Sequence, residues 1–495
     1  MQTEHFDVLI VGAGLSGIGA ACHLQARCPD RSYAILEGRA ASGGTWDLFR
    51  YPGIRSDSDM FTLGYAFKPW LGEKSITDGP SILSYVRETA TEQGVDRHIR
   101  YSHQVTAAAW STEQAAWTIE ATRDGKPVTF TAAFLLLCGG YYSYAAGYTP
   151  DFPGTDRYFG QVVHPQAWPP NLDHARKRVV VIGSGATAMT LAPALAQTAR
   201  HVTLLQRSPT YVVPLPSRDP VADALRKWLP ARLAYALTRW RKLAISMVMF
   251  RALRKNPRAG KARLLGFVRA SLGPDYDVET HFTPRYNPWD QRLCVVPDGD
   301  LFRAIRAGTL AMATDHIETF TETGLKLASG AELAADIVVT ATGLVLQPLA
   351  GLKPTVDGRA VDPGHALAYK GMMFDGVPNL ASVFGYTKAS WTLKADLSSE
   401  YVCRILNHMT RSGMQQATPH NDDPSLGREP WLDFTSGYVR RAMESFPKQG
   451  SRAPWKLHQN YLKDLLGLKF AKLEDGVLRF SNPREAGISR HAAIP

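Results

Sequence analysis

Short apolar runs that alternate with glycine-rich turns open the chain and predict parallel strands connected by helices. The first unit is a strand, a helix and a second strand directly followed by Glu37, predicted over 6–11, 18–25 and 33–36. The same order recurs in a second unit, predicted over 178–182, 189–198 and 201–205. The pattern therefore predicts an α/β fold with two Rossmann-like dinucleotide-binding units.

Further periodic segments lie around these two units. An amphipathic pattern predicts helices over 80–93 and near 399–409. Alternating or wholly apolar runs predict strands over 105–110, 117–122, 128–131, 134–138, 335–341 and 377–384. Asp124 and Gly125 predict a tight turn within the alternating group.

The glycines of the first unit have the spacing that a bound pyrophosphate requires. Gly12 turns the chain, Gly14 lets the backbone approach the phosphates, and Gly17 lets the helix pack close to the strand. The helix N-terminus then offers N–H groups and positive potential to the phosphates. Glu37 stands where a carboxylate would accept hydrogen bonds from a ribose 2′-hydroxyl.

The second unit carries Gly183, Gly185 and Thr187 in its turn but has no acid after its second strand. Arg207 follows there instead. A carboxylate would repel a 2′-phosphate, whereas a guanidinium can bind it through charge-assisted hydrogen bonds. The first unit therefore suits FAD and the second suits NADPH, although Arg207 could also be a solvated charge at the end of a strand.

These assignments divide the chain into a nested arrangement. Residues 1–145 are expected to form the first part of the FAD-binding domain and 350–495 its second part with a C-terminal tail. Residues 146–215 and 276–349 are expected to form the NADP-binding domain, interrupted by a basic helical subdomain over 216–275.

Length and cysteine content exclude several other classes. A chain of 495 residues exceeds one ordinary core and suggests two or three domains. No signal peptide precedes the first strand, and no apolar run approaches the roughly 20 residues of a membrane span. Five scattered cysteines without CxxC spacing predict reduced thiols, a cytoplasmic location and no metal site.

The net charge of +11 is concentrated in one segment. Residues 217–275 contain fourteen Lys or Arg and three Asp, so the rest of the chain is neutral. Leu233, Leu237, Trp240, Ala244 and Met247 recur there at helical spacing. The favoured interpretation is a helical subdomain that packs on its neighbour and exposes a basic face. The alternative is a peripheral membrane contact through 216–275; no recognition motif indicates nucleic acid.

Two longer motifs resemble those of Baeyer–Villiger monooxygenases. The first comprises Gly43, Gly44, Thr45, Trp46, Tyr51, Pro52, Gly53 and Asp57, in a loop whose aromatic residues suit a flat ligand. The second comprises Tyr158, Phe159, Gly160, His164 and Trp168, with tyrosine where the family usually has phenylalanine. The chain is most similar to the ethionamide-activating type, through 45–57 and 287–292.

The resemblance implies a mechanism and roles for particular residues. NADPH would reduce FAD, O2 would add to form a C4a-peroxyflavin, and a ketone would become an ester or lactone; sulfides would be further substrates. Arg292 would stabilise the peroxide anion, and Asp57 would orient that arginine. The alternative role of Arg292 is a structural ion pair, and that of Asp57 is a loop cap. Gly160, His164 and Trp168 would couple domain movement to catalysis. Trp391 would line the nicotinamide or substrate pocket, or belong to the core.

Two alternatives to this function stay open at this point. One is a flavin-containing monooxygenase that acts only on sulfur or nitrogen centres. The other is a non-catalytic flavin-bound redox sensor or membrane-docked partner, which Asp57 and Arg292 disfavour. A disulfide reductase is disfavoured because no CxxxxC pair follows the first unit.

Overall fold

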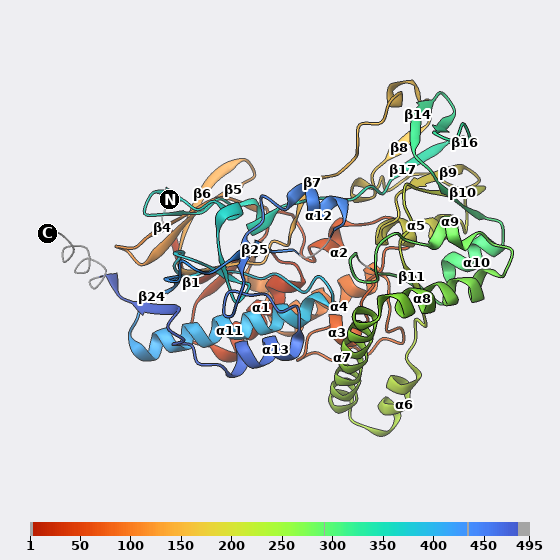
Figure 1. Cartoon of the computed structure of the whole chain (residues 1–495). Coiled ribbons are helices and arrows are strands. Elements are labelled where there is room, and N and C mark those ends of the chain that lie inside the picture. Colours follow the sequence, from red (N-terminus) through yellow and green to blue (C-terminus); the bar gives the residue numbers. More distant parts are fainter. Residues whose placement is uncertain (1–2, 292, 433–434, 484–495) are drawn as a thin grey trace.

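Two separate β-sheets organise the chain into two lobes (Figure 1). The computed structural model describes residues 3–291, 293–432 and 435–483. The first lobe contains both ends of the described chain, and the second lobe lies between them in the sequence. All five cysteines are buried and free, as predicted.

The first lobe is built around a parallel sheet whose central strand, β1 (Glu4–Val11), ends in a buried apolar run, Val8 to Val11. β1 pairs with β2 (Tyr33–Leu36) on one side and β6 (Lys126–Leu137) on the other, so that Val8 lies opposite both Tyr33 and Phe134. β3 (Ile99–Arg100) and β23 (Leu380–Ser382) extend the sheet in parallel. β4 (His103–Ser111) and β5 (Ala116–Arg123) join β6 as an antiparallel meander.

β6 replaces the two separate strands predicted over 128–131 and 134–138. Its first half pairs with β5, where Val128 lies opposite Ala121, and its second half pairs with β1. The strand thus passes from the antiparallel meander into the parallel sheet without a turn. Its pattern changes from alternating to wholly apolar because only the second half is buried on both faces.

Two helices cover one face of this sheet and pack against each other. α1 (Leu15–Arg27) follows β1 directly, and α11 (Trp391–Ser412) lies alongside it. α11 starts well before the predicted 399–409 because its first half buries polar side chains that conceal the apolar period. Lys394 is buried with Asp464 at 3.1 Å, and Asp396 lies 3.2 Å from His23.

The second lobe has a sheet of five parallel strands. Its order is β13 (Leu310–Thr314), β10 (His201–Gln206), β9 (Arg178–Ile182), β17 (Ile337–Thr340) and β8 (Gln161–Val163). α5 (Ala186–Leu195) follows β9, as predicted, and α10 (Asp300–Arg306) packs against α5. This arrangement confirms the prediction of two Rossmann-like units.

Two strands connect the lobes. β7 (Tyr142–Gly147) leaves the first lobe and β18 (Leu344–Leu346) returns to it, and the two pair antiparallel with Gly147 opposite Leu344. Because both connections run side by side, the relative position of the lobes depends on this short ribbon and on the loops beside it.

The remaining elements are short and complete the two lobes. The helices are α2 (Thr45–Leu48), α3 (Met60–Leu63), α4 (Gly79–Glu92), α9 (Val278–Phe282), α12 (Gly437–Ala442) and α13 (Tyr461–Leu465), which continues as a π-helical turn, Leu466–Phe470. The strands are β11 (Val212–Leu215), β12 (Cys294–Pro297), β14 (Ile317–Thr321), β15 (Gly324–Leu327), β16 (Glu332–Ala334), β19 (Thr355–Val356), β20 (Arg359–Ala360), β21 (Ala368–Tyr369), β22 (Met373–Phe374), β24 (Gln416–Pro419), β25 (Arg428–Pro430), β26 (Lys448–Gly450) and β27 (Leu478–Ser481).

The basic segment forms three consecutive helices, α6 (Pro220–Trp228), α7 (Ala231–Lys255) and α8 (Pro257–Leu272). Asp219 caps α6 and Asn256 caps α8, each accepting a hydrogen bond from a backbone N–H of the first turn. α8 packs against the second lobe, whereas α7 packs against α3 of the first lobe (Figure 1). None of the described helices combines the length and apolar character that a bilayer crossing requires.

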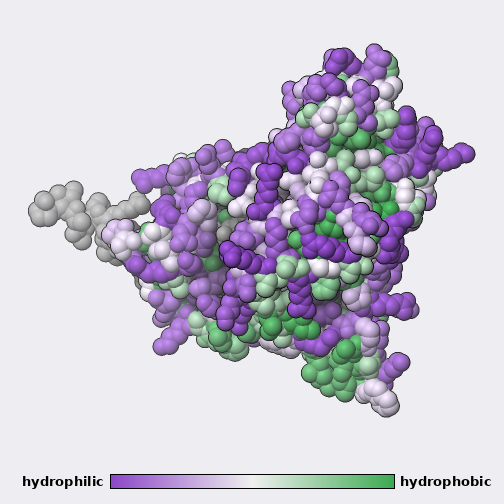
Figure 2. All heavy atoms as spheres, turned by 45° about the vertical axis from the view of Figure 1, so that its right-hand side comes forward, coloured by the Kyte–Doolittle hydropathy of each residue, from purple (hydrophilic) through white to green (hydrophobic). Residues whose placement is uncertain are grey.

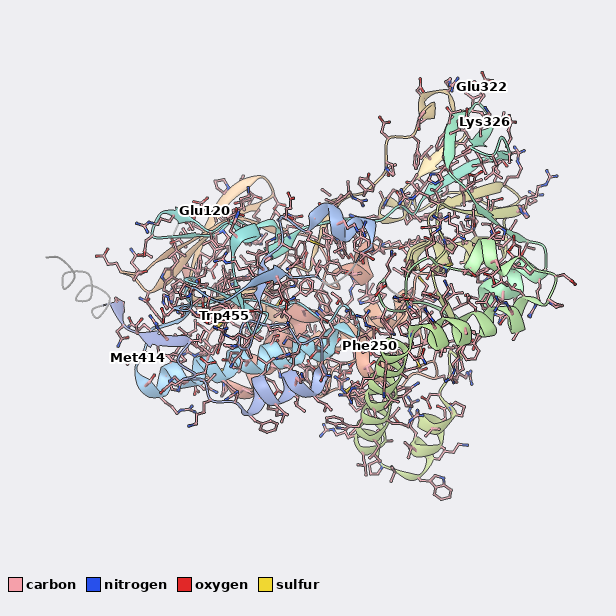
Figure 3. The ribbon with its side chains drawn as sticks, in the orientation of Figure 1. Glu120, Phe250, Glu322, Lys326, Met414 and Trp455 are labelled. Atoms are coloured by element: carbon pink, nitrogen blue, oxygen red, sulfur yellow. The ribbon has the colours of Figure 1, made fainter. Side chains whose placement is uncertain are left out.

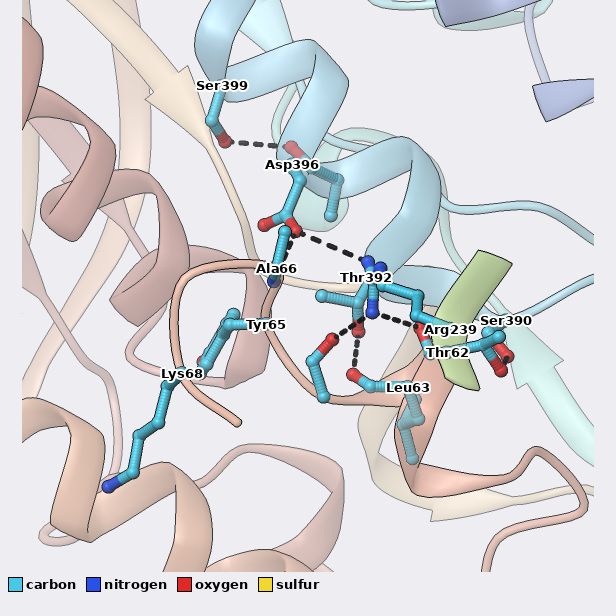
Figure 4. A network of polar contacts seen from close by, with 12 residues as sticks. Thr62, Leu63, Tyr65, Ala66, Lys68, Arg239, Ser390, Thr392, Asp396 and Ser399 are labelled. Carbon is cyan, nitrogen blue, oxygen red and sulfur yellow. Dashed lines mark hydrogen bonds and ion pairs between the residues drawn. The ribbon is translucent and has the colours of Figure 1, made fainter. Parts of the chain in front are cut away.

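Arg239 fastens α7 to the first lobe (Figure 4). Its side chain is buried, and Nη1 donates to the carbonyl oxygens of Phe61 and Gly64, both at 2.8 Å. Nη2 lies 3.7 Å from the buried carboxylate of Asp396. Backbone acceptors and an opposite charge together offset the cost of burying this guanidinium.

Replacing Arg239 with methionine should therefore destabilise the protein. We expect Arg239→Met to lower the free energy of unfolding by about 3 kcal/mol, because it removes the cation beside the buried carboxylate of Asp396 and the donor to two carbonyl groups. Chemical denaturation measures this change. Arg251→Met, an exposed position on the same helix, should stay within about 0.5 kcal/mol of the wild type. Equal losses for both variants would contradict the role of Arg239.

Candidate active site

The first glycine turn brings backbone into contact with backbone. Gly12 follows β1 with φ +102°, and a Cβ on Gly17 would lie 1.9 Å from the Gly12 carbonyl oxygen. A Cβ on Gly14 would lie 3.5 Å from Cα of Gly44, which belongs to the first long motif. α1 begins here without a side-chain cap and without an acidic residue in its first turn. The turn thus presents an uncapped positive helix end to an anionic group.

Glu37 lies directly beside this turn. Its carboxylate accepts hydrogen bonds from the backbone N–H groups of Ala13, at 2.7 Å, and Arg39, at 3.0 Å. Burial raises the pKa of Glu37, and the two N–H groups oppose that rise. Each carboxylate oxygen has two lone pairs, so the side chain can also accept hydrogen bonds from ribose hydroxyls.

The loop that carries the first long motif, residues 43–57 and called the motif loop below, packs over the first glycine turn. The Gly43 N–H donates to the Ala13 carbonyl at 3.0 Å, and Thr45 Oγ1 lies 2.6 Å from the hydroxyl of Tyr142. Gly44 adopts φ +55° and ψ −124°, a conformation that side chains disfavour. The structure therefore brings Gly14, Gly44 and Thr45 together at one place.

Asp47 holds this loop, and sequence reasoning missed it. Its carboxylate is 2% exposed and forms ion pairs with Arg39, Arg50 and Arg87 at 2.6, 2.9 and 2.8 Å. Asp47 lies between motif residues, and Arg50 is a local partner three residues later. Arg39 and Arg87 come from other parts of the sequence, and only the fold shows that they reach the same carboxylate.

The second half of the motif loop reaches the other lobe. A Cβ on Gly53 would lie 2.6 Å from Cβ of Ala194 in α5, and Tyr51 packs in the core of the second lobe. The Tyr51 hydroxyl is hydrogen-bonded to Thr187, and burial raises the pKa of Tyr51 to about 12. Trp46 packs against the cores of both lobes. One loop thus contacts both dinucleotide turns.

Asp57 ends this loop, close enough to Tyr51 for its negative charge to contribute to the raised pKa of that tyrosine. Nearby, Arg55 forms a 2.5 Å ion pair with Asp300 at the start of α10. Arg292 lies outside the described residues. The pairing of Asp57 with Arg292 therefore stays a prediction.

The second glycine turn repeats the geometry of the first. Gly183 has φ +141°, and a Cβ there would lie 2.3 Å from the carbonyl oxygen of Ala341. Gly185 precedes α5, which has no side-chain cap, and a Cβ at Gly185 would meet open space. The N-terminus of α5 is therefore accessible in the same way as that of α1.

The two units differ at the end of their second strand. Val11 lies opposite Leu36 and Ile182 lies opposite Leu205, so Gln206 takes the place of Glu37. Gln206 is buried, and its Nε2 donates to the His281 carbonyl at 2.7 Å and to Thr314 Oγ1 at 3.0 Å. Arg207 is exposed directly after it. Comparison of the two units could have identified Gln206 from the sequence.

His164 of the second motif lies beside the ribbon between the lobes. His164 Nδ1 accepts from the Gln166 N–H at 3.1 Å, and Nε2 lies 3.2 Å from the Gly343 carbonyl oxygen beside β18. A Cβ on Gly147 of β7 would lie 1.8 Å from the imidazole, and burial lowers the pKa of His164. These contacts place a neutral imidazole against both connecting strands.

The other two coupling residues have different surroundings. A Cβ on Gly160 would lie 2.6 Å from the carbonyl oxygen of Asp336, next to β17, and Trp168 packs on the core of the second lobe. The structure thus places His164 at the connection but Gly160 and Trp168 within the second lobe. Their predicted role in domain coupling stays a prediction.

Trp391 begins α11 and lies beside the first turn. Its indole N–H donates to Ser16 Oγ at 2.8 Å, and its ring stacks on Tyr141 with centroids 5.1 Å apart. Trp391 thus joins the starts of α11 and α1. Its predicted place in a nicotinamide or substrate pocket stays untested.

Two glycine turns contacted by one loop define the class: a protein with two Rossmann-like dinucleotide-binding units linked by a shared loop. Family models agree with this class. "Flavin-binding monooxygenase-like" matches residues 75–223 and "NAD(P)-binding Rossmann-like domain" matches residues 10–68.

The relatives identify the family. The FAD-containing monooxygenase EthA of Mycobacterium tuberculosis is 53% identical over 489 residues, which are 98% of this chain and 100% of the relative. The putative FAD-containing monooxygenase MymA of the same species is 49% identical over 499 residues, 99% of this chain and 100% of the relative. The chain belongs to this family of FAD-containing, flavin-dependent monooxygenases.

A solved structure shows the same fold. Oxidized steroid monooxygenase bound to NADP aligns with a TM-score of 0.70 at 24% identity, over 84% of this chain and 88% of that chain. The open structure of cyclohexanone monooxygenase aligns with a TM-score of 0.69 at 21% identity, over 85% of this chain and 91% of that chain. The resemblance stated from the motifs is thereby confirmed at the level of the family.

The geometry at Glu37 generates a prediction about FAD. Glu37→Gln should weaken FAD binding about tenfold to a hundredfold, because a neutral amide must point its NH2 group at one of the two backbone donors. Flavin titration of the cofactor-free protein measures this dissociation constant.

Glu120→Gln supplies the control, since Glu120 is exposed on β5 at the far side of the first lobe (Figure 3). It should bind FAD like the wild type. Unchanged FAD affinity in Glu37→Gln would show that the carboxylate does not contact the cofactor.

Proposed function

We propose that this chain is an FAD- and NADPH-dependent Baeyer–Villiger monooxygenase. It inserts one oxygen atom of O2 beside a ketone carbonyl to give an ester or lactone, and it also oxidises sulfides and thioamides. The observation that carries the proposal is the loop 43–57, which packs on the first glycine turn through Gly44 and on α5 of the second unit through Gly53. A loop in contact with both units supports a single reaction centre that both cofactors reach.

The residues of the first lobe fit FAD. Gly12, Gly14 and Gly17 leave room for the pyrophosphate at the N-terminus of α1, and Glu37 is oriented toward a ribose by two backbone N–H groups. When bound, FAD supplies the redox chemistry and the reaction with O2. The protein has to bind it, orient it and exclude water.

The residues of the second lobe fit a phosphorylated nicotinamide cofactor. Gln206 replaces the acid of the first unit, which removes the negative charge that would repel a 2′-phosphate. Arg207 adds an exposed guanidinium at the same strand end. Thr187, in the first turn of α5, already contacts the motif loop through Tyr51. The two cofactor sites therefore share one wall.

Asp57 and Arg292 are the proposed catalytic pair. The proposal rests on the motif and on the position of Asp57 in the loop that contacts both turns. A permanent guanidinium charge stabilises an oxyanion in a dry pocket, and a carboxylate partner lowers the cost of burying that cation. His164, Gly160 and Trp168 would transmit lobe movement to this pair.

Arg207 should discriminate between the two nicotinamide cofactors. Arg207→Ala should raise the KM for NADPH at least about tenfold and change that for NADH little, because only NADPH carries the 2′-phosphate. Steady-state NADPH and NADH oxidation measure both constants. Arg200→Ala, exposed next to the opposite end of β10, should leave both constants unchanged. Equal effects of Arg207→Ala on both cofactors would contradict the proposed contact.

Arg292 tests the chemistry itself. Arg292→Ala should lower ester formation from a linear ketone at least about a hundredfold, while NADPH still bleaches the flavin absorbance. Product analysis and stopped-flow absorbance separate these two readouts. Lys261→Ala changes a cation of the helical segment that donates to the Pro284 carbonyl at 2.6 Å and should retain product formation.

Normal ketone turnover by Arg292→Ala would refute this assignment. A wild-type enzyme that consumes O2 with a thioether but not with any ketone would instead support a flavin-containing monooxygenase restricted to sulfur and nitrogen. The match of 75–223 to the broader flavin-binding monooxygenase model is the observation that favours this second candidate.

A further inference from the structure

The helices α6, α7 and α13, along the lower side of the molecule in Figure 1, carry large apolar side chains in contact with solvent. Trp228 at the end of α6 is 86% exposed, and Leu466 and Phe470 after α13 are 63% and 67% exposed. We call the complete set the apolar edge; its members are Trp228, Leu233, Leu237, Trp240, Leu462, Leu466 and Phe470. An exposed apolar area of this extent is unusual on a monomeric protein and marks an interaction surface.

α7 exposes the side that its sequence predicts to be buried. Leu233, Leu237 and Trp240 are spaced three or four residues apart, yet each is nearly half exposed. The opposite side of α7 buries Tyr235, whose hydroxyl donates to the carbonyl of Tyr65, and Arg239. The sequence favoured a helix whose apolar stripe packs on its neighbour while its basic face is solvated. In α7 the apolar stripe is instead partly exposed, and Arg239 is buried.

The members of the edge belong to one surface. The ring of Trp240 contacts the ring of Tyr461, with centroids 5.9 Å apart, and thereby joins α7 to α13. α6, α7 and α13 lie along the same lower side of the molecule (Figure 1), and apolar side chains gather there in the space-filling view (Figure 2). The surface is spread over projecting helices rather than sunk into a groove.

Basic side chains accompany this edge. Residues 217–275 contain fourteen Lys or Arg and only three Asp, and one of these, Asp219, is neutralised by Arg241 and by Lys242 at 2.7 Å. Lys227 and Arg232 are exposed on either side of Trp228 along the chain, and Lys463 is exposed next to Leu462. The edge thus combines apolar side chains with positive charge.

We propose that the apolar edge docks on the surface of a lipid bilayer that contains anionic headgroups. Helices lying in the plane of the interface insert tryptophan and leucine side chains below the headgroups and place Lys and Arg beside the phosphates. The charge of the segment complements an anionic surface, and the proposal does not depend on the reaction catalysed.

A second copy of this chain fits the same surface poorly. In a two-fold symmetric contact the edge would face itself, so the positive surface that carries Lys227, Arg232 and Lys463 would face an equally positive surface. Like charges across an interface oppose association, whereas anionic lipids remove this repulsion. Charge therefore favours the bilayer over self-association.

Vesicle co-sedimentation of the FAD-loaded protein tests the proposal. At low salt the wild type should bind phosphatidylglycerol–phosphatidylcholine vesicles at least about tenfold more tightly than pure phosphatidylcholine vesicles, and added salt should release it. The triple variant Trp228→Ser, Leu233→Ser, Leu237→Ser should lose at least about tenfold in binding. Lys227→Glu with Arg232→Glu should weaken binding to the anionic vesicles specifically.

Tyr101→Ser is the matched control, because Tyr101 is 36% exposed in the turn between β3 and β4, in another part of the first lobe. It should bind anionic vesicles like the wild type. Flavin content and NADPH oxidation check that each variant is folded. The proposal is overturned if the wild type ignores anionic vesicles at low salt, or if the triple variant binds them undiminished. It is also overturned if the wild type is a dimer without vesicle binding and the triple variant is a monomer, since a second copy would then cover the edge.

Discussion

Close backbone packing at two strand-to-helix turns is the constraint on which the rest of this structure depends. At Gly17 and at Gly183 an added Cβ would lie 1.9 Å and 2.3 Å from a backbone carbonyl oxygen. A side chain at Gly17 would push α1 away from β1, and one at Gly183 would push the second turn away from the backbone that follows β17. Both helices also begin without a side-chain cap, which leaves their N-termini free to bind phosphate groups.

The two turns become one site because a single loop contacts both. The loop adopts backbone conformations at Gly44 and Gly53 that disfavour side chains, and three arginines hold it at the buried Asp47. Its ends therefore have a defined position relative to each lobe. The ribbon of β7 and β18, with His164 packed against it, is the other connection that sets the distance between the two cofactor sites.

The inserted helices show how burial of a charge and exposure of an apolar surface can be linked. Arg239 has backbone acceptors and Asp396 within the first lobe, so the side of α7 that carries Arg239 faces inward. Leu233, Leu237 and Trp240 consequently face outward and stay nearly half exposed, which forgoes part of the roughly 1.5–3 kcal/mol that full burial of such a side chain contributes. A bilayer that covers these side chains would remove this cost. Its anionic headgroups would also pair with the basic side chains of 217–275.

The sequence alone determined the two dinucleotide units and the family, because these depend on local rules. A glycine at a tight turn, an apolar run of strand length and an acid directly after a strand can be recognised from neighbouring residues. Only the tertiary structure decided what depends on partners distant in the chain. It joined β6 into one strand, extended α11 through buried Lys394 and Asp396, brought three arginines to Asp47, and turned the apolar stripe of α7 outward. Most of the deciding contacts join residues far apart in sequence, such as Lys394 with Asp464 and Arg239 with Asp396. Helical or strand periodicity carries no information about which of two faces will find a partner.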